Sequence, residues 1–152
     1  MENYAGAYES RLQDVTALLG CTPVRSIAAA HLGGVAIECR IKALILDYHK
    51  ITKWDDPSQR PKDPMRKQPV ARPGHSLITG LRQMDDLYRK AKADKLFLEH
   101  LACLTRPAGS TALDFIDLRY CADELGQETL HNWQRSLNYV QGWLKKNEGL
   151  TI

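Results

Sequence analysis

The hydrophobic residues between positions 27 and 49 recur at the spacing of an α-helix. This stretch reads IAAAHLGGVAIECRIKALILDYH, and a rotation of roughly 100° per residue gathers its apolar side chains on one face. That face consists of Ile27, Ala30, Gly34, Val35, Ile37, Ile41, Leu44, Ile45 and Tyr48. Because Thr22 and Pro23 form a helix-start signal, we expect a buried central helix from there to about Lys50.

Glu38 interrupts the apolar face of this predicted helix, and Lys42 follows it one turn later. The free-energy cost of burying an unpaired carboxylate is several times larger than the stabilisation that an exposed ion pair provides. We therefore expect both residues to meet a third polar group from another helix, as a structural ion pair or as part of a site for a ligand or partner enzyme. Gly33 and Gly34 each cost about 1 kcal/mol relative to Ala in a helix, which predicts close approach by a crossing helix.

Four further segments show helical periodicity. They span residues 4–19, 75–93, 95–104 and 128–146. The apolar stripe of the first consists of Tyr8, Leu12, Val15 and Leu19. Residues 110–126 are predicted to be irregular with one short turn, and no strand pattern is convincing. The predicted fold class is therefore all-α: a single domain over residues 1–152, built as an up-and-down helical bundle of four to five helices.

A proline-rich basic loop at about residues 51–74 separates the central helix from the next one. It contains five of the seven prolines and no usable periodicity, which argues against a regular element. From Lys50 to Gly74 there are seven basic and three acidic residues, an excess of +4 that is larger than the net charge of +3 for the whole chain. A loop of this length is either a solvated linker or a contact surface for nucleic acid or a partner.

The composition argues against several classes of protein. The chain is 43% hydrophobic and 26% charged, and it has neither an apolar run long enough to span a membrane nor a signal-peptide pattern. The four cysteines are widely spaced without a CxxC pair, which favours reduced thiols in the cytoplasm and argues against a zinc site. No residue spacing suits a metal or a glycine-rich nucleotide loop, so we expect no metal and no cofactor.

Three motifs in this order resemble the HEPN (higher eukaryotes and prokaryotes nucleotide-binding) domain family. The most specific is A-x-E-C-x-x-K-A-L within AHLGGVAIECRIKALI, and GHSLITGL and DLRY follow it. The polar residues of interest in these motifs are Glu38, Lys42, His75, Arg119 and Tyr120. The resemblance covers about residues 10–146 and implies a compact all-α bundle, usually a homodimer, found mostly in prokaryotes.

The resemblance implies several functional groups. Some members are partners of small nucleotidyltransferases and are encoded beside them as toxin and antitoxin. Others are metal-independent endoribonucleases, and a third group consists of binding modules for a nucleotide or RNA.

The nuclease branch of the family is marked by the motif R-x(4-6)-H near the start of a late helix. Arg119 is followed by CADELGQET, and the next histidine, His131, lies too far along the chain. Arg25 and His31 have the required spacing but lie at the start of the central helix. With eleven arginines and five histidines, one accidental match is expected. Arg119, Arg25 and His31 are therefore only weak candidates for catalytic residues.

We expect one polar cleft between the central and last helices. Its predicted members are Glu38, Lys42, His75, Arg119 and Tyr120. For two of these residues another role remains open. His75 could cap its own helix instead, and Arg119 could pair with nearby carboxylates rather than with a phosphate. Trp133 and Trp143 lie on the apolar side of the last helix and are predicted to belong to the core and an interface.

Three functions follow as hypotheses. The first is a dimeric HEPN module that binds a nucleotide or RNA and associates with a nucleotidyltransferase or another toxin-antitoxin or defence partner. The second is a metal-independent endoribonuclease. The third is a non-catalytic protein-interaction domain whose basic loop docks another protein.

Overall fold

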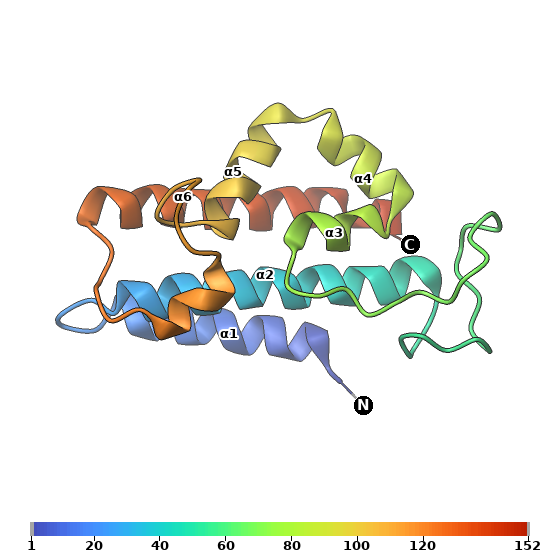
Figure 1. Cartoon of the computed structure of the whole chain (residues 1–152), viewed down its shortest axis with the longest axis horizontal. Coiled ribbons are helices and arrows are strands. Elements are labelled where there is room, and N and C mark those ends of the chain that lie inside the picture. The colour runs from blue at the N-terminus through green and yellow to red at the C-terminus, as the bar shows by residue number, and fades with distance from the viewer. Residues whose placement is uncertain (1, 152) are drawn as a thin grey trace.

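The computed structural model describes residues 2–151, which form a helical bundle (Figure 1). The α-helices are α1 (Tyr4–Leu19), α2 (Ser26–His49), α3 (Leu77–Arg82), α4 (Asp85–Lys92), α5 (Lys95–Thr105) and α6 (Gln127–Asn147). Two 3-10 helices, η1 (Phe115–Tyr120) and η2 (Glu148–Thr151), precede and follow α6. The predicted all-α class is confirmed, and no strand occurs in the described residues.

Helix α2 runs through the middle of the bundle. Figure 1 shows α1 along one side of it and α6 along the other, while α3, α4 and α5 form an arch that leads back toward α6. Helix α2 contacts α1, α3, α5, α6 and both 3-10 helices. Fifteen of its 24 residues are buried, which confirms the prediction of a buried central helix.

The two glycines of α2 allow close approach by neighbouring elements. A Cβ atom at Gly33 would collide with the ring of Trp133 in α6, and one at Gly34 would collide with the ring of Phe115 in η1. The predicted approach of a crossing helix is thus confirmed at Gly33, whereas the neighbour at Gly34 is a 3-10 helix.

The start of α2 differs from the prediction. The helix begins at Ser26, three residues after Pro23, and the preceding Arg25 makes no capping hydrogen bond with its side chain. Instead, the carboxylate of Glu124 accepts hydrogen bonds from Oγ of Ser26 (2.7 Å) and from the backbone nitrogen of Ile27 (2.8 Å). The cap therefore comes from the segment before α6, which is remote in the sequence.

The helix predicted at residues 75–93 is two helices. Helix α3 ends at Arg82 and α4 begins at Asp85, so the chain changes direction at Gln83 and Met84. The carbonyl oxygen of Gln83 lies 2.6 Å from Nε2 of His49 at the end of α2. This tertiary hydrogen bond satisfies a carbonyl that a continuous helix would pair internally.

The proline-rich loop between α2 and α3 contains no helix or strand, as predicted. Its ends are nevertheless anchored, because Ile51 and Val70 are buried in the core. The backbone nitrogen of Asp55 donates to the oxygen of Val70 (2.8 Å), and the backbone nitrogen of Lys62 donates to Nδ1 of His49 (3.0 Å). These contacts hold the loop against the C-terminal end of α2.

Candidate functional site

A buried ion pair lies in the middle of α2. Nζ of Lys42 is 2.6 Å from Oε1 of Glu38, and the two residues are only 7% and 8% exposed. Their spacing of four positions places both side chains on the same face of the helix, as the sequence predicts. The pair is consequently shielded from the solvent screening that weakens surface ion pairs.

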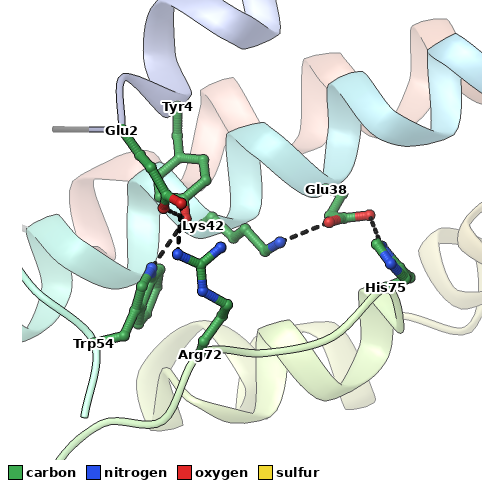
Figure 2. Close-up of polar contacts among 7 residues, drawn as sticks. All are labelled: Glu2, Tyr4, Glu38, Lys42, Trp54, Arg72 and His75. Atoms are coloured by element: carbon green, nitrogen blue, oxygen red, sulfur yellow. Dashed lines mark hydrogen bonds and ion pairs between the residues drawn. The ribbon is translucent and has the colours of Figure 1, made fainter.

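His75 supplies the third polar group beside this pair. Its Nδ1 lies 2.9 Å from Oε2 of Glu38, and Figure 2 shows the imidazole pointing at the carboxylate. An ionised carboxylate only accepts hydrogen bonds, so Nδ1 carries the hydrogen and Nε2 of the neutral ring is an acceptor. Because the imidazole is 58% exposed, a ligand can reach it while Glu38 fixes its orientation.

The position of His75 decides between its two predicted roles. Helix α3 is capped by Ser76, whose Oγ accepts a hydrogen bond from the backbone nitrogen of Thr79 (3.3 Å). The imidazole of His75 does not cap the helix and forms a hydrogen bond with Glu38 instead. The third polar group therefore comes from the residue before the cap of α3.

A second polar group lies next to the first (Figure 2). Nε1 of Trp54 donates to the hydroxyl of Tyr4 (2.9 Å), and this hydroxyl donates in turn to the carboxylate of Glu2. The guanidinium of Arg72 also donates to Glu2. Nζ of Lys42 lies 5.7 Å from the centre of the Tyr4 ring, so the lysine connects the two groups.

The hydrogen bonds of the second group favour the charged forms of Glu2 and Arg72. Donation by Tyr4, and then by Arg72, lowers the pKa of Glu2 below its ordinary value. The hydrogen bond to Glu2 raises the pKa of Arg72. Burial raises the pKa of Tyr4, with a further contribution from its bond to Glu2. At neutral pH the group thus contains a carboxylate, a guanidinium and a neutral phenol.

A pocket of about 500 Å³ opens at this second group. Its lining consists of Glu2, Tyr4, Leu46, Thr52, Lys53, Trp54, Asp55 and Arg72. The two aromatic rings offer a surface for a planar group, and the cations Lys53 and Arg72 offer partners for an anion that competes with the carboxylates of Glu2 and Asp55. We call this the Trp54 pocket.

No match to the chain was found among models of protein families, curated proteins or solved structures.

Four members of the site were not predicted from the sequence. They are Glu2, Tyr4, Trp54 and Arg72. Trp54 and Arg72 both lie in the proline-rich basic loop, so the combination of one tryptophan with several cations was the available signal. Glu2 and Tyr4 carried no comparable signal, because their role depends on the packing of α1 beside this loop.

Arg119 and Tyr120 lie elsewhere. Both are exposed residues of η1, and Cζ of Arg119 lies 4.8 Å from the centre of the Tyr120 ring. Within residues 2–151 neither forms a hydrogen bond or ion pair with the Glu38 group, and Arg119 pairs with no carboxylate. The predicted cleft is thus incomplete: three of its five members meet, and they do so between α2 and the start of α3.

Arg25 and His31 have structural partners. Nε of Arg25 lies 3.8 Å from Oε1 of Glu124, and Nδ1 of His31 lies 2.9 Å from the carbonyl oxygen of Phe115. Both contacts fasten the N-terminal half of α2 to the segment before α6. These contacts give no support to a catalytic pair.

Trp133 and Trp143 are buried, with exposed fractions of 0% and 7%. They belong to the core, as predicted, and offer no surface for the interface that was also predicted.

Residues 2–151 contain neither a metal-binding cluster nor a membrane-spanning helix. No cluster of three or more histidine, cysteine or carboxylate side chains has an arrangement that suits a metal. No helix in this range has the length and apolar character needed to cross a membrane.

Proposed function

We propose that the chain is a HEPN-like module that binds a nucleotide or RNA in the Trp54 pocket. The observation that carries this proposal is the lining of the pocket, which combines two aromatic rings with the cations Lys53 and Arg72. An aromatic ring can stack on a nucleobase, a contact worth about 1–3 kcal/mol per base. A guanidinium matches the geometry of a phosphate group.

The charge of the neighbouring loop supports the same ligand. The excess of +4 between Lys50 and Gly74 lies in the segment that supplies Trp54 and Arg72. Such a concentration of positive charge attracts polyanions and makes their affinity depend on salt.

The residues of the HEPN resemblance also bear on this proposal. Glu38 and Lys42 come from its most specific motif, and His75 comes from the second. Hydrogen bonds from Glu38 to Lys42 and to His75 connect the residues of the two motifs. Lys42 also lies beside the ring of Tyr4, which lines the Trp54 pocket. The proposal includes a nucleotidyltransferase or another toxin-antitoxin or defence protein as partner, and a cytoplasmic location, where the four free cysteines stay reduced.

We further propose that the module is a homodimer. The predicted apolar stripe of α1 is only partly covered, because Val15 alone is buried in that helix. The rest of the stripe lines two adjoining hollows between α1 and α6, of about 740 and 250 Å³, which share Leu12, Asn138 and Gln141. We call them the α1–α6 groove.

The charges of the α1–α6 groove suit a second copy of the chain. Its charged lining residues are Glu9, Arg40, Lys145 and Glu148. In a two-fold dimer the same surface meets itself, so a surface with equal numbers of both signs avoids self-repulsion.

Light scattering tests the dimer. Thr16 is an exposed residue of this groove, so Thr16→Arg should convert a dimer into a monomer without disturbing the core. Thr79→Arg, an exposed position on α3, is the matched control. A monomeric wild-type protein contradicts the dimer.

A metal-independent endoribonuclease is the second candidate, and the bond between His75 and Glu38 favours it. A carboxylate that fixes one ring nitrogen leaves the other positioned to take a proton from a ribose hydroxyl. Single-stranded RNA in EDTA should then be cut by the wild type and by Arg119→Ala but not by His75→Ala. An intact RNA substrate contradicts this candidate.

Fluorescence anisotropy with labelled single-stranded RNA and with a labelled adenine nucleotide tests the main proposal. Arg72→Ala and Trp54→Ala should each weaken binding about tenfold, and higher salt should weaken RNA binding further. Arg135→Ala removes an exposed arginine from α6 and is the control. Absence of binding at low salt, or equal losses in all three variants, overturns the proposal and favours the protein-interaction domain.

A further inference from the structure

Another pocket, which shares no lining residue with the Trp54 pocket or the α1–α6 groove, lies beside α5. It is an open pocket of about 710 Å³, bordered by α3, α5, the connection after α5 and the first turns of α6. None of its lining residues belongs to the Glu38 group or to the Trp54 pocket. We call it the α5 pocket.

The lining of the α5 pocket is mainly apolar. Its apolar members are Ile78, Leu98, Leu101, Ala102, Cys103, Pro107 and Ala108. The remaining lining residues are Thr105, Arg106, Gly109, Ser110, Thr129 and Asn132. Pockets of this size with an apolar wall and a few polar groups are typical of small-molecule sites in helical bundles.

Arg106 is the only charged residue of this lining. Its Nη1 donates to the carbonyl oxygen of Ser110 (2.8 Å), which holds the guanidinium at the connection after α5. Within residues 2–151 no carboxylate lies within ion-pair distance of it. An arginine has five N–H donors, so most of them remain available to a ligand.

We propose that the α5 pocket binds a small organic acid. The apolar body of the ligand, aliphatic or aromatic, contacts the wall formed by α5, and its carboxylate pairs with Arg106. The single positive charge, with no acidic residue in the lining, selects an anion over a cation or a neutral molecule of the same shape. This site is independent of the proposed nucleotide or RNA binding.

Cys103 offers a direct report of occupancy. It is a free, partly buried cysteine in the wall of the pocket. Cys21 is free and exposed and lies outside this lining, so it serves as an internal reference in the same molecule. A bound ligand should slow alkylation of Cys103 while leaving that of Cys21 unchanged.

The experiment compares octanoate with 1-octanol, which has the same chain length and no charge. Alkylation of each cysteine is followed by peptide mass spectrometry across a range of ligand concentrations. For the wild type, octanoate should protect Cys103 at about fivefold lower concentration than octanol, as expected for one partly exposed ion pair. Arg106→Ala should remove this difference, and Arg106→Lys should keep part of it.

A second variant tests the pocket itself. Ala102 is an exposed lining residue, so Ala102→Trp can fill the space without disturbing the core, and calorimetric binding of octanoate should be lost. Equal protection by octanoate and octanol in the wild type overturns the role of Arg106. Protection of neither cysteine, or of Cys21 as much as Cys103, overturns the site.

Discussion

Nδ1 of His75 lies 2.9 Å from Oε2 of Glu38, so an exposed imidazole is bonded to a buried carboxylate. The other oxygen of Glu38 binds Lys42. One carboxylate therefore joins α2 to the start of α3 and neutralises a buried ammonium group. Loss of the Glu38 carboxylate would therefore break both contacts at once.

Replacement of Glu38 by Ala should destabilise the protein by about 3 kcal/mol. The variant leaves the ammonium of Lys42 buried without its partner, and breaking a buried pair in this way typically costs about 3–5 kcal/mol. Urea unfolding at pH 7 measures the effect as a shift of the midpoint.

Two further variants make this prediction specific. Glu99→Ala removes an exposed carboxylate from α5 and should change stability by less than about 0.5 kcal/mol. The double variant Glu38→Ala, Lys42→Met should recover part of the loss, because it also removes the unpaired charge. If Glu38→Ala unfolds at the wild-type midpoint, the pair contributes nothing to stability.

His49 should make the protein less stable at mildly acidic pH. Burial lowers the pKa of this histidine below its ordinary value, and Nδ1 accepts a hydrogen bond from the backbone nitrogen of Lys62. Protonation would abolish that acceptor. Because the unfolded state takes up the proton more readily, the stabilisation is complete above the unfolded pKa of about 6.5 and decreases as pH falls through it.

Urea unfolding at pH 7.5 and 5.5 tests the contribution of His49. The wild type should lose stability by up to about 1.4 kcal/mol per pH unit from this group, and His49→Gln should show a smaller loss. His131→Gln changes an exposed histidine of α6 and should behave like the wild type. A His49→Gln profile that parallels the wild type would contradict the assignment.

The elements that the sequence predicted well are those with local causes. The bounds of α1 agree with the prediction, and α2 is buried because its apolar residues recur at helical spacing. The predicted start of α2 was wrong because the helix is capped by Glu124, which lies more than 70 residues after the end of α2 in the sequence. The break between α3 and α4 was missed because it depends on the bond between His49 and Gln83.

In the candidate site, too, the local contacts were predictable and the contacts between distant segments were not. Glu38 and Lys42 are four residues apart on one helix, so their pairing was predictable from spacing. Tyr4 and Trp54 belong to segments separated by fifty residues, and only the packing of α1 beside the proline-rich loop brings them together. A contact between such distant segments produces no hydrophobic periodicity in the sequence, so it could not be predicted in this way.

Gly34→Ala should destabilise the protein by at least about 1 kcal/mol, although Ala is the better helix former. A Cβ atom at this position would collide with the ring of Phe115, so η1 has to move or its packing is lost. Thermal unfolding followed by circular dichroism measures the change.

Gly142→Ala in α6 is the matched control for this substitution. Apart from its chain neighbours and the backbone of α6 itself, no atom lies within 4 Å of a Cβ built there, so the change should stabilise the protein by about 0.5–1 kcal/mol through helix propensity. The two variants are thus expected to shift the melting temperature in opposite directions. A stabilised Gly34→Ala protein would show that η1 is not packed against α2 as described.

Glu2→Gln should increase the affinity of the Trp54 pocket for a phosphate-bearing ligand. The carboxylate of Glu2 already holds the guanidinium of Arg72 and the hydroxyl of Tyr4, so a phosphate has to compete with it. A glutamate is ordinarily ionised at neutral pH, and these two donors lower the pKa of Glu2 still further. Neutralising an exposed competitor of this kind should tighten binding about threefold.

Anisotropy titrations of the same labelled nucleotide with the wild type and four variants separate competition from a general effect of charge. Glu9→Gln removes a carboxylate outside the lining of the Trp54 pocket and should leave the affinity unchanged. In the Arg72→Ala background Glu2→Gln should have no effect, because the shared partner is gone. If Glu2→Gln weakens binding instead, Glu2 orients Arg72 for the ligand rather than competing with it.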